Sequence, residues 1–217
     1  MNKYIDSFLD EFSQPVYIKI PDNNYIEAYS NKLPNNLLDM WKKFGFCSFL
    51  NGLFSITDPE EYQNVITDWF NAAGISLINK NFHIIAMSGF GDLFVWEEIE
   101  GRSYEINLMN GWIIANDSNK EADLEKQINL FFASKSPYSL DIEDQDTNEE
   151  IFDIAVDKLG QLEHGEIFGF MPALITGGEM KIENLQKINF YIYLDYILQL
   201  TTPRVVTLDD LKNMTFS

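Results

Sequence analysis

Hydrophobic positions in the first part of the chain recur at the three- to four-residue spacing of amphipathic helices. Pro34 suits the first position of one such helix, and Gly45 suits the position just past its end. Asp58 begins another, because its side chain can cap the first turn while Glu61 completes a capping box. The pattern predicts helices over residues 1–12, 34–44 and 58–70, and strands over residues 16–20 and 53–57.

From Phe82 onward the spacing of hydrophobic residues changes from helical to strand-like, and these residues occur in short runs. Asn110-Gly111 is a strong two-residue hairpin signal, and Gly89 with Gly91 indicates a tight turn between strands. Turns of this kind join neighbouring antiparallel strands, so a meander is expected. The predicted strands are Phe82–Met87, Leu93–Glu98, Ser103–Met109 and Trp112–Ala115.

The last third of the chain returns to helical spacing. Thr147 and Glu150 can form a capping box that opens a helix through Ile151 and Leu159, which ends at Gly160. The apolar run Phe190–Leu200 is long for a strand and is predicted to be a buried helix; it contains Asp195 and is much shorter than the ~20 residues of a membrane span. The expected fold class is α+β, with a central antiparallel sheet (a meander), helices packed around it, and two subdomains, residues 1–88 and 89–217, that share a continuous core.

Charge narrows the classes of partner. The 217 residues carry a net charge of −19; the first 90 contain 6 basic and 10 acidic residues, and the remainder contains 9 basic and 24 acidic residues. Such a surface repels nucleic acid and anionic membranes, which are therefore excluded as partners. It favours a cationic protein that associates by electrostatic steering. Solubility alone is the alternative explanation of the charge.

The excess of acids is concentrated in residues 141–153, a segment with seven acidic residues and no basic one. Carboxylates near a helix start are favoured by the helix dipole, so a solvated helix start is one interpretation. The other is a surface that binds a basic partner. A calcium loop counted from Asp144 fails, because Glu149 stands where glycine is needed and Ala155 stands where the bidentate glutamate belongs. The predicted partner-binding residues are Asp141, Glu143, Asp144, Asp146, Glu149 and Glu150.

The sequence offers no recognisable catalytic, metal or cofactor site. Ser88 lacks the flanking glycines of a nucleophile elbow. Cys47 lies between phenylalanines and is predicted to be a buried, inert thiol, while His83 in a strand is interpreted as structural and His164 in an acidic loop as solvated. Two histidines and one cysteine make a zinc site improbable. We therefore expect a protein that is not an enzyme and needs no cofactor.

Several motifs resemble a known pair of domains in order and spacing. The first set of motifs is Leu33-Pro34, Leu37, Trp41, Gly45, Gly52-Leu53-Phe54, Asp58-Pro59-Glu60-Glu61-Tyr62 and Trp69. The second set is Phe90-Gly91-Asp92-Leu93-Phe94-Val95-Trp96, Phe168-Gly169-Phe170-Met171-Pro172-Ala173-Leu174 and Gly177-Gly178. The first set resembles the GAD-like domain, and the second is similar to the C-terminal domain that commonly follows it in type VI secretion DNase-immunity proteins. A broader similarity connects the Leu-Pro, Trp and Gly pattern of the first set to the SMI-and-KNR-like immunity superfamily.

This resemblance implies an immunity protein that binds a cognate toxin, often a nuclease, and neutralises it in a stoichiometric complex. A protein- or ligand-binding regulatory module without a toxin target is the alternative.

Cys47 stands alone, so no internal disulfide is possible. The first eleven residues include Asp6, Asp10 and Glu11 and lack the apolar stretch of a signal peptide, so a cytoplasmic location is expected.

Overall fold

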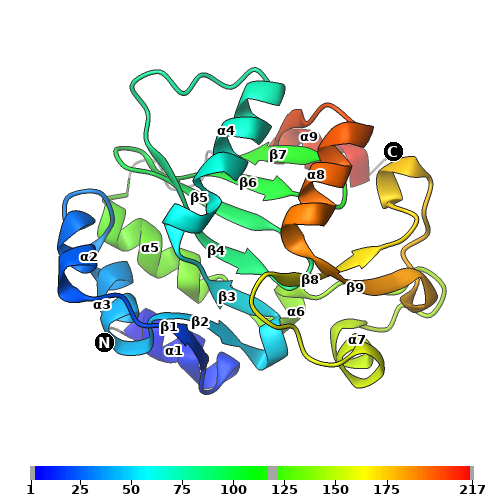
Figure 1. Cartoon of the computed structure of the whole chain (residues 1–217), viewed down its shortest axis with the longest axis horizontal. Coiled ribbons are helices and arrows are strands. Elements are labelled where there is room, and N and C mark those ends of the chain that lie inside the picture. The colour runs from blue at the N-terminus through cyan, green and yellow to red at the C-terminus, as the bar shows by residue number, and fades with distance from the viewer. Residues whose placement is uncertain (1–2, 117–121, 216–217) are drawn as a thin grey trace.

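A twisted eight-stranded sheet runs through the computed structural model, which describes residues 3–116 and 122–215 (Figure 1). Neighbouring strands are antiparallel except at one edge, where β10 lies parallel to β7. The order across the sheet is β1 (Val16–Lys19), β2 (Phe46–Phe49), β3 (Phe54–Ile56), β4 (Phe82–Ser88), β5 (Leu93–Glu97), β6 (Gly101–Asn107), β7 (Trp112–Ala115) and β10 (Arg204–Thr207).

Helices cover both faces of the central strands, because residues on both faces of these strands are apolar. On β5, Phe94 and Trp96 belong to the core on one face, whereas Leu93 and Val95 belong to the core on the other. The first face is covered by α1 (Lys3–Phe12), α2 (Asn23–Ala28), α3 (Asn35–Phe44) and α5 (Leu124–Ala133), and the second by α4 (Gln63–Ala72) and α8 (Phe190–Leu200), as Figure 1 shows.

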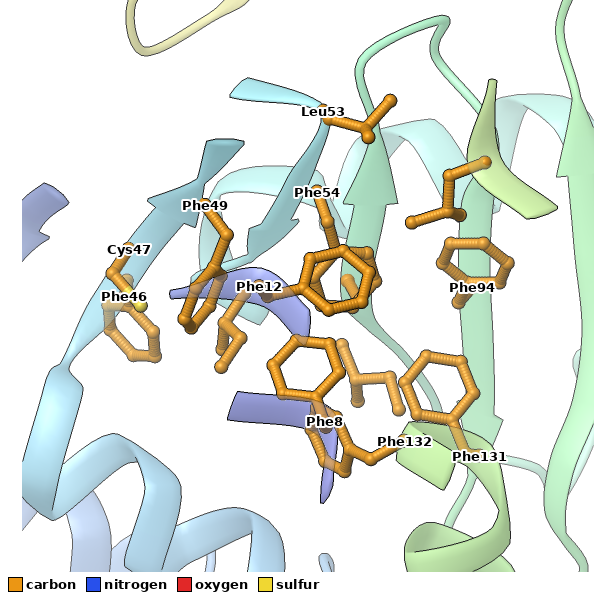
Figure 2. Packing of buried hydrophobic residues seen from close by; sticks show 14 of the residues in the cluster. Phe8, Phe12, Phe46, Cys47, Phe49, Leu53, Phe54, Phe94, Phe131 and Phe132 are labelled. Carbon is orange, nitrogen blue, oxygen red and sulfur yellow. The ribbon is translucent and has the colours of Figure 1, made fainter. Parts of the chain in front are cut away.

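The core on the first face is rich in phenylalanine. Rings from α1, the sheet and α5 converge on Phe54, which is completely buried (Figure 2). Phe8 and Phe12 of α1 stack on each other with their ring centroids 4.3 Å apart. Helical spacing in α1 places these rings on one face, so the periodicity of the sequence directly determines how this helix packs.

The C-terminal part adds a two-stranded antiparallel sheet, β8 (Glu166–Phe170) and β9 (Leu185–Asn189), and further helices α6 (Pro137–Leu140), α7 (Phe152–Leu159) and α9 (Leu208–Thr215). It joins the main sheet at Gly89, whose carbonyl oxygen accepts a hydrogen bond from the Phe168 amide at 2.8 Å. A side chain at Gly89 has no room, since an added Cβ would lie 2.6 Å from the ring of Phe152.

The fold class expected from the sequence is confirmed: a large, mostly antiparallel sheet has helices packed around it. The predicted meander corresponds to β4–β7, and the last predicted helix corresponds to α8. The division after residue 88 stays a prediction. The pattern did not anticipate β2, β8, β9 or β10. In the part of the chain that the structure describes, every helix is too short or too polar to cross a membrane.

Candidate functional site

The acidic segment, residues 141–153, comprises the loop of residues 141–151 that connects α6 to α7 and the first two residues of α7. Three backbone hydrogen bonds close the loop. They run from the Asp144 amide to the Glu149 carbonyl at 2.9 Å, from the Asn148 amide to the Asp144 carbonyl at 2.8 Å, and from the Ile151 amide to the Ile142 carbonyl at 3.0 Å. Asn148 has a φ of 57°, a left-handed conformation that asparagine tolerates better than most residues. Glu143 and Glu150 lie opposite each other in an antiparallel bridge. The loop therefore presents its acids in a fixed arrangement.

Two of the predicted partner-binding acids hold the backbone. Asp141 accepts hydrogen bonds from the amides of Ile142 at 2.7 Å and Phe152 at 3.0 Å, and so caps the first turn of α7. Its partial burial raises its pKa, although these amides oppose the shift. The predicted capping box of Thr147 and Glu150 is not formed, because α7 begins at Phe152 and Asp141 caps it.

Asp144 is only 4% exposed and ties the loop to the following part of the domain. Its carboxylate accepts hydrogen bonds from the amides of Ile182 at 2.8 Å, Asp146 at 2.9 Å and Thr147 at 3.2 Å. These amides, Ile182 first, lower its pKa because they favour the charged form. Asp144 therefore remains charged but directs that charge into the loop.

The other four predicted acids are exposed. Asp146 forms an ion pair with Lys181 at 3.0 Å, and Lys181 also contacts Glu179 at 3.2 Å. Solvent screens exposed pairs of this kind, so they contribute little to stability. Among the described residues, Glu143, Glu149 and Glu150 form no ion pair with a base. These three carboxylates therefore direct uncompensated negative charge into solvent.

An open groove lies beside the acidic segment. Its volume, including the open mouth, is about 910 Å³, and its lining includes Tyr138, Asp141, Glu143, Gln145 and Met180. Tyr138 is 69% exposed, and tyrosine is one of the residues that most often anchor protein interfaces. The groove can hold a segment of polypeptide with basic side chains. Sequence reasoning missed Tyr138 and Met180, because neither belongs to the charged run that marks the site.

The residues considered for catalysis do not come together. Cys47 is fully buried, and burial raises the pKa of its thiol to about 12. His83 Nε2 bonds Glu98 at 2.9 Å, and His164 Nε2 bonds Glu61 at 3.0 Å. Among the described residues, no group of three or more potential ligands is placed to hold a metal ion.

Two family models match the chain in succession. A GAD-like domain matches residues 3–110, and the C-terminal domain of the type VI secretion immunity protein Tdi1 matches residues 125–201. The chain is a GAD-like protein with a Tdi1-type immunity domain. The first match runs from α1 to just beyond β6, and the second from α5 to α8, so the acidic segment of this immunity protein lies inside the Tdi1-type domain.

A solved structure shares the fold of this immunity protein. The crystal structure of Atu4351 from Agrobacterium tumefaciens superposes with a TM-score of 0.79 at 20% identity, covering 96% of this chain and 93% of that one. At that identity the likeness concerns the fold alone. Among curated proteins, no sequence matches this chain.

Proposed function

We propose that this type VI secretion immunity protein neutralises a nuclease toxin by forming a stoichiometric complex with it. The observation that carries the proposal is the Tdi1-type immunity domain, whose exposed acidic segment belongs to a chain of net charge −19. Nucleases hold phosphate with lysine and arginine, so their clefts are basic. A carboxylate-rich surface can occupy such a cleft or its rim without being cleaved. This activity requires binding alone, in the cytoplasm where the DNA of the producing cell lies.

Co-expression tests the function directly. The gene of this protein would be expressed together with the gene that lies next to it in the genome, whose product is the candidate toxin. Cell survival and co-purification of the two proteins would be measured. We expect the immunity protein to restore growth and to purify with the neighbouring gene product at a fixed stoichiometry. Growth arrest with no complex would refute the proposal and would favour a binding module with another role.

Within this function, the acidic segment is proposed to steer the toxin into contact. Asp141 and Asp144 hold the loop, whereas the exposed acids act on the encounter, because rim charges change association rates more than affinity. The exposed acids of the proposed binding set are Glu143, Asp146, Glu149 and Glu150.

Reversing these four charges to lysine is expected to slow association about tenfold or more at low salt and to flatten its salt dependence. Stopped-flow binding to the neighbouring gene product at several salt concentrations measures both effects. A matched control reverses four exposed acids of α1 and α2, namely Asp6, Asp10, Glu11 and Glu27, which changes net charge equally. Equal slowing by both variants would mean that net charge, not this segment, steers the toxin.

A further inference from the structure

A second hollow lies at the junction of the two domains. Helices α4 and α8 cover β4–β7 on one face of the sheet, whereas further along that face, among the described residues, the loop of residues 160–165 between α7 and β8 runs beside β3 (Figure 1). The amide of Leu162 in this loop donates a hydrogen bond to the carbonyl of Asn51 at 3.0 Å. The narrow cleft between loop and strands, here called the junction cleft, has a volume of about 490 Å³ including its open mouth.

The floor of the junction cleft is polar where a covered sheet would be apolar. Ser48 of β2 and Ser55 of β3 are directly paired across the two strands, and both line the cleft. Within the described residues, neither hydroxyl has a side-chain hydrogen bond to another group. Two hydroxyl groups are thus available to accept hydrogen bonds from a guest with N–H donors.

The rim of the junction cleft carries more acids than bases. Asp58 is paired with Lys19 at 2.6 Å and Glu166 with Lys187 at 3.2 Å, whereas Glu61 is paired only with His164. Glu163, also on the rim, forms no ion pair among the described residues. The GAD-like domain supplies Asp58 and Glu61, and the Tdi1-type domain supplies the loop. The excess of carboxylates therefore depends on both domains.

The apolar wall beside this rim is formed by Tyr191 and Ile192 of α8, because Tyr62 itself is only 1% exposed. Tyr62 lines the junction cleft, and its ring stacks on Tyr191 of α8 with their centroids 6.0 Å apart. Ile192, the next residue of α8, is 68% exposed. Lysine and arginine side chains place their apolar stems on such surfaces while their charged groups reach carboxylates. A buried hydrophobic centre with a charged rim is also the usual arrangement of a strong protein interface.

We infer that the junction cleft receives a lysine or arginine side chain of the toxin, and that an apolar toxin residue beside it packs on Ile192. The inference rests on the proposed function and adds a second contact to the acidic segment. The carboxylates of Glu61 and Glu163 bind the cationic group, and the hydroxyls of Ser48 and Ser55 accept its remaining hydrogen bonds. The acidic segment accelerates the encounter, whereas this anchor slows dissociation, because a desolvated central contact acts mainly on the dissociation rate.

Two independent single substitutions test the junction cleft, with the neighbouring gene product as the probe. Glu163→Lys reverses the unpaired rim charge, and Ile192→Asp removes the apolar wall; both residues are exposed, so the melting temperature should change little. Each is expected to raise the dissociation constant at least tenfold, mainly through faster dissociation. Matched controls are Glu11→Lys on the opposite face and Ile99→Asp in the β5–β6 turn, where Ile99 is 78% exposed.

The outcomes separate the inference from the proposed function. Tenfold weakening by both cleft substitutions, with both controls within twofold of the wild type, supports the junction cleft as the anchor. If the wild-type protein forms the complex and the cleft variants dissociate from it at the wild-type rate, the inference is overturned and the immunity function stays intact. Failure of the wild-type protein to bind the neighbouring gene product overturns both.

Discussion

Replacing Phe54 with alanine is expected to lower the free energy of unfolding by about 3–5 kcal/mol. Phe54 is fully buried at the centre of the phenylalanine cluster on the α1 and α5 face (Figure 2). Removing its ring takes away contacts to several elements at once and leaves a cavity that rigid neighbouring rings cannot fill. The rings within 6.4 Å of it belong to Phe8, Phe12, Phe49, Phe94 and Phe131.

Urea denaturation, followed by tryptophan fluorescence, measures this effect. A drop of this size is a large fraction of the roughly 5–15 kcal/mol that stabilises a typical domain. Phe54→Leu therefore serves as a milder variant, because leucine still fills much of the space of the ring. Its expected loss of unfolding free energy is less than about 1.5 kcal/mol. Tyr138→Ala is the control, because Tyr138 is 69% exposed and its loss should change stability by about 0.5 kcal/mol or less. Equal losses for Phe54→Ala and Tyr138→Ala would contradict a core centred on Phe54.

The elements that the sequence predicted well are those whose pattern is local. The spacing of Leu37, Leu38 and Trp41, with Gly45 past the end, predicted α3, and Gly45 indeed ends that helix with a φ of 69°. β2 was missed because it is only four residues long and begins directly after that glycine. β10 was missed for a different reason: Val205 pairs with Ile113, far away in the chain, and no local pattern encodes a parallel pairing of that kind.

The candidate surface was predictable in its charge but not in its geometry. The number of acidic residues in the sequence was enough to identify residues 141–153 as the candidate surface. The burial of Asp144, however, depends on backbone amides such as that of Ile182, which lies far from Asp144 in the sequence. The predicted buried helix is α8, but packing on one side only leaves Ile192 68% exposed. Tertiary contacts therefore decided which acids hold the backbone and which face solvent.

A polar network inside the main sheet was also beyond reach of the sequence pattern. Asp92, after the Gly89–Gly91 turn, accepts hydrogen bonds from Ser88 Oγ at 3.0 Å and Asn107 Nδ2 at 2.7 Å. Burial, with the nearby charge of Glu105, raises the pKa of Asp92 to about 7, although these hydrogen bonds and Lys135 oppose the shift. Burial lowers the pKa of Lys135, whose ammonium lies 3.8 Å from the centre of the Phe94 ring, to about 8.

Asp92 is therefore expected to make the protein less stable as pH rises from 5 to 7.5. Its carboxyl has a pKa of about 7 when folded, against an ordinary value of 3.8, so the folded state holds the proton more tightly. The resulting stabilisation is fully present below pH 3.8 and is lost as pH rises through about 7. Across the range from pH 5 to 7.5, which stays below the pKa of Lys135, the loss amounts to about 2–3 kcal/mol.

Asp92→Asn isolates this contribution, because asparagine has nearly the same shape, keeps an acceptor for Asn107, and does not titrate. Relative to the wild type, the variant should gain about 2–3 kcal/mol of unfolding free energy between pH 5 and 7.5, measured by urea denaturation at each pH. Asp68→Asn, at an exposed position on α4, is the control for removing one carboxylate from the surface. A constant difference for Asp92→Asn would mean that Asp92 is already ionised at pH 5, with Lys135 and its hydrogen bonds outweighing burial. The slope of stability with pH thus reports directly which of the two opposing influences on this carboxyl is the stronger.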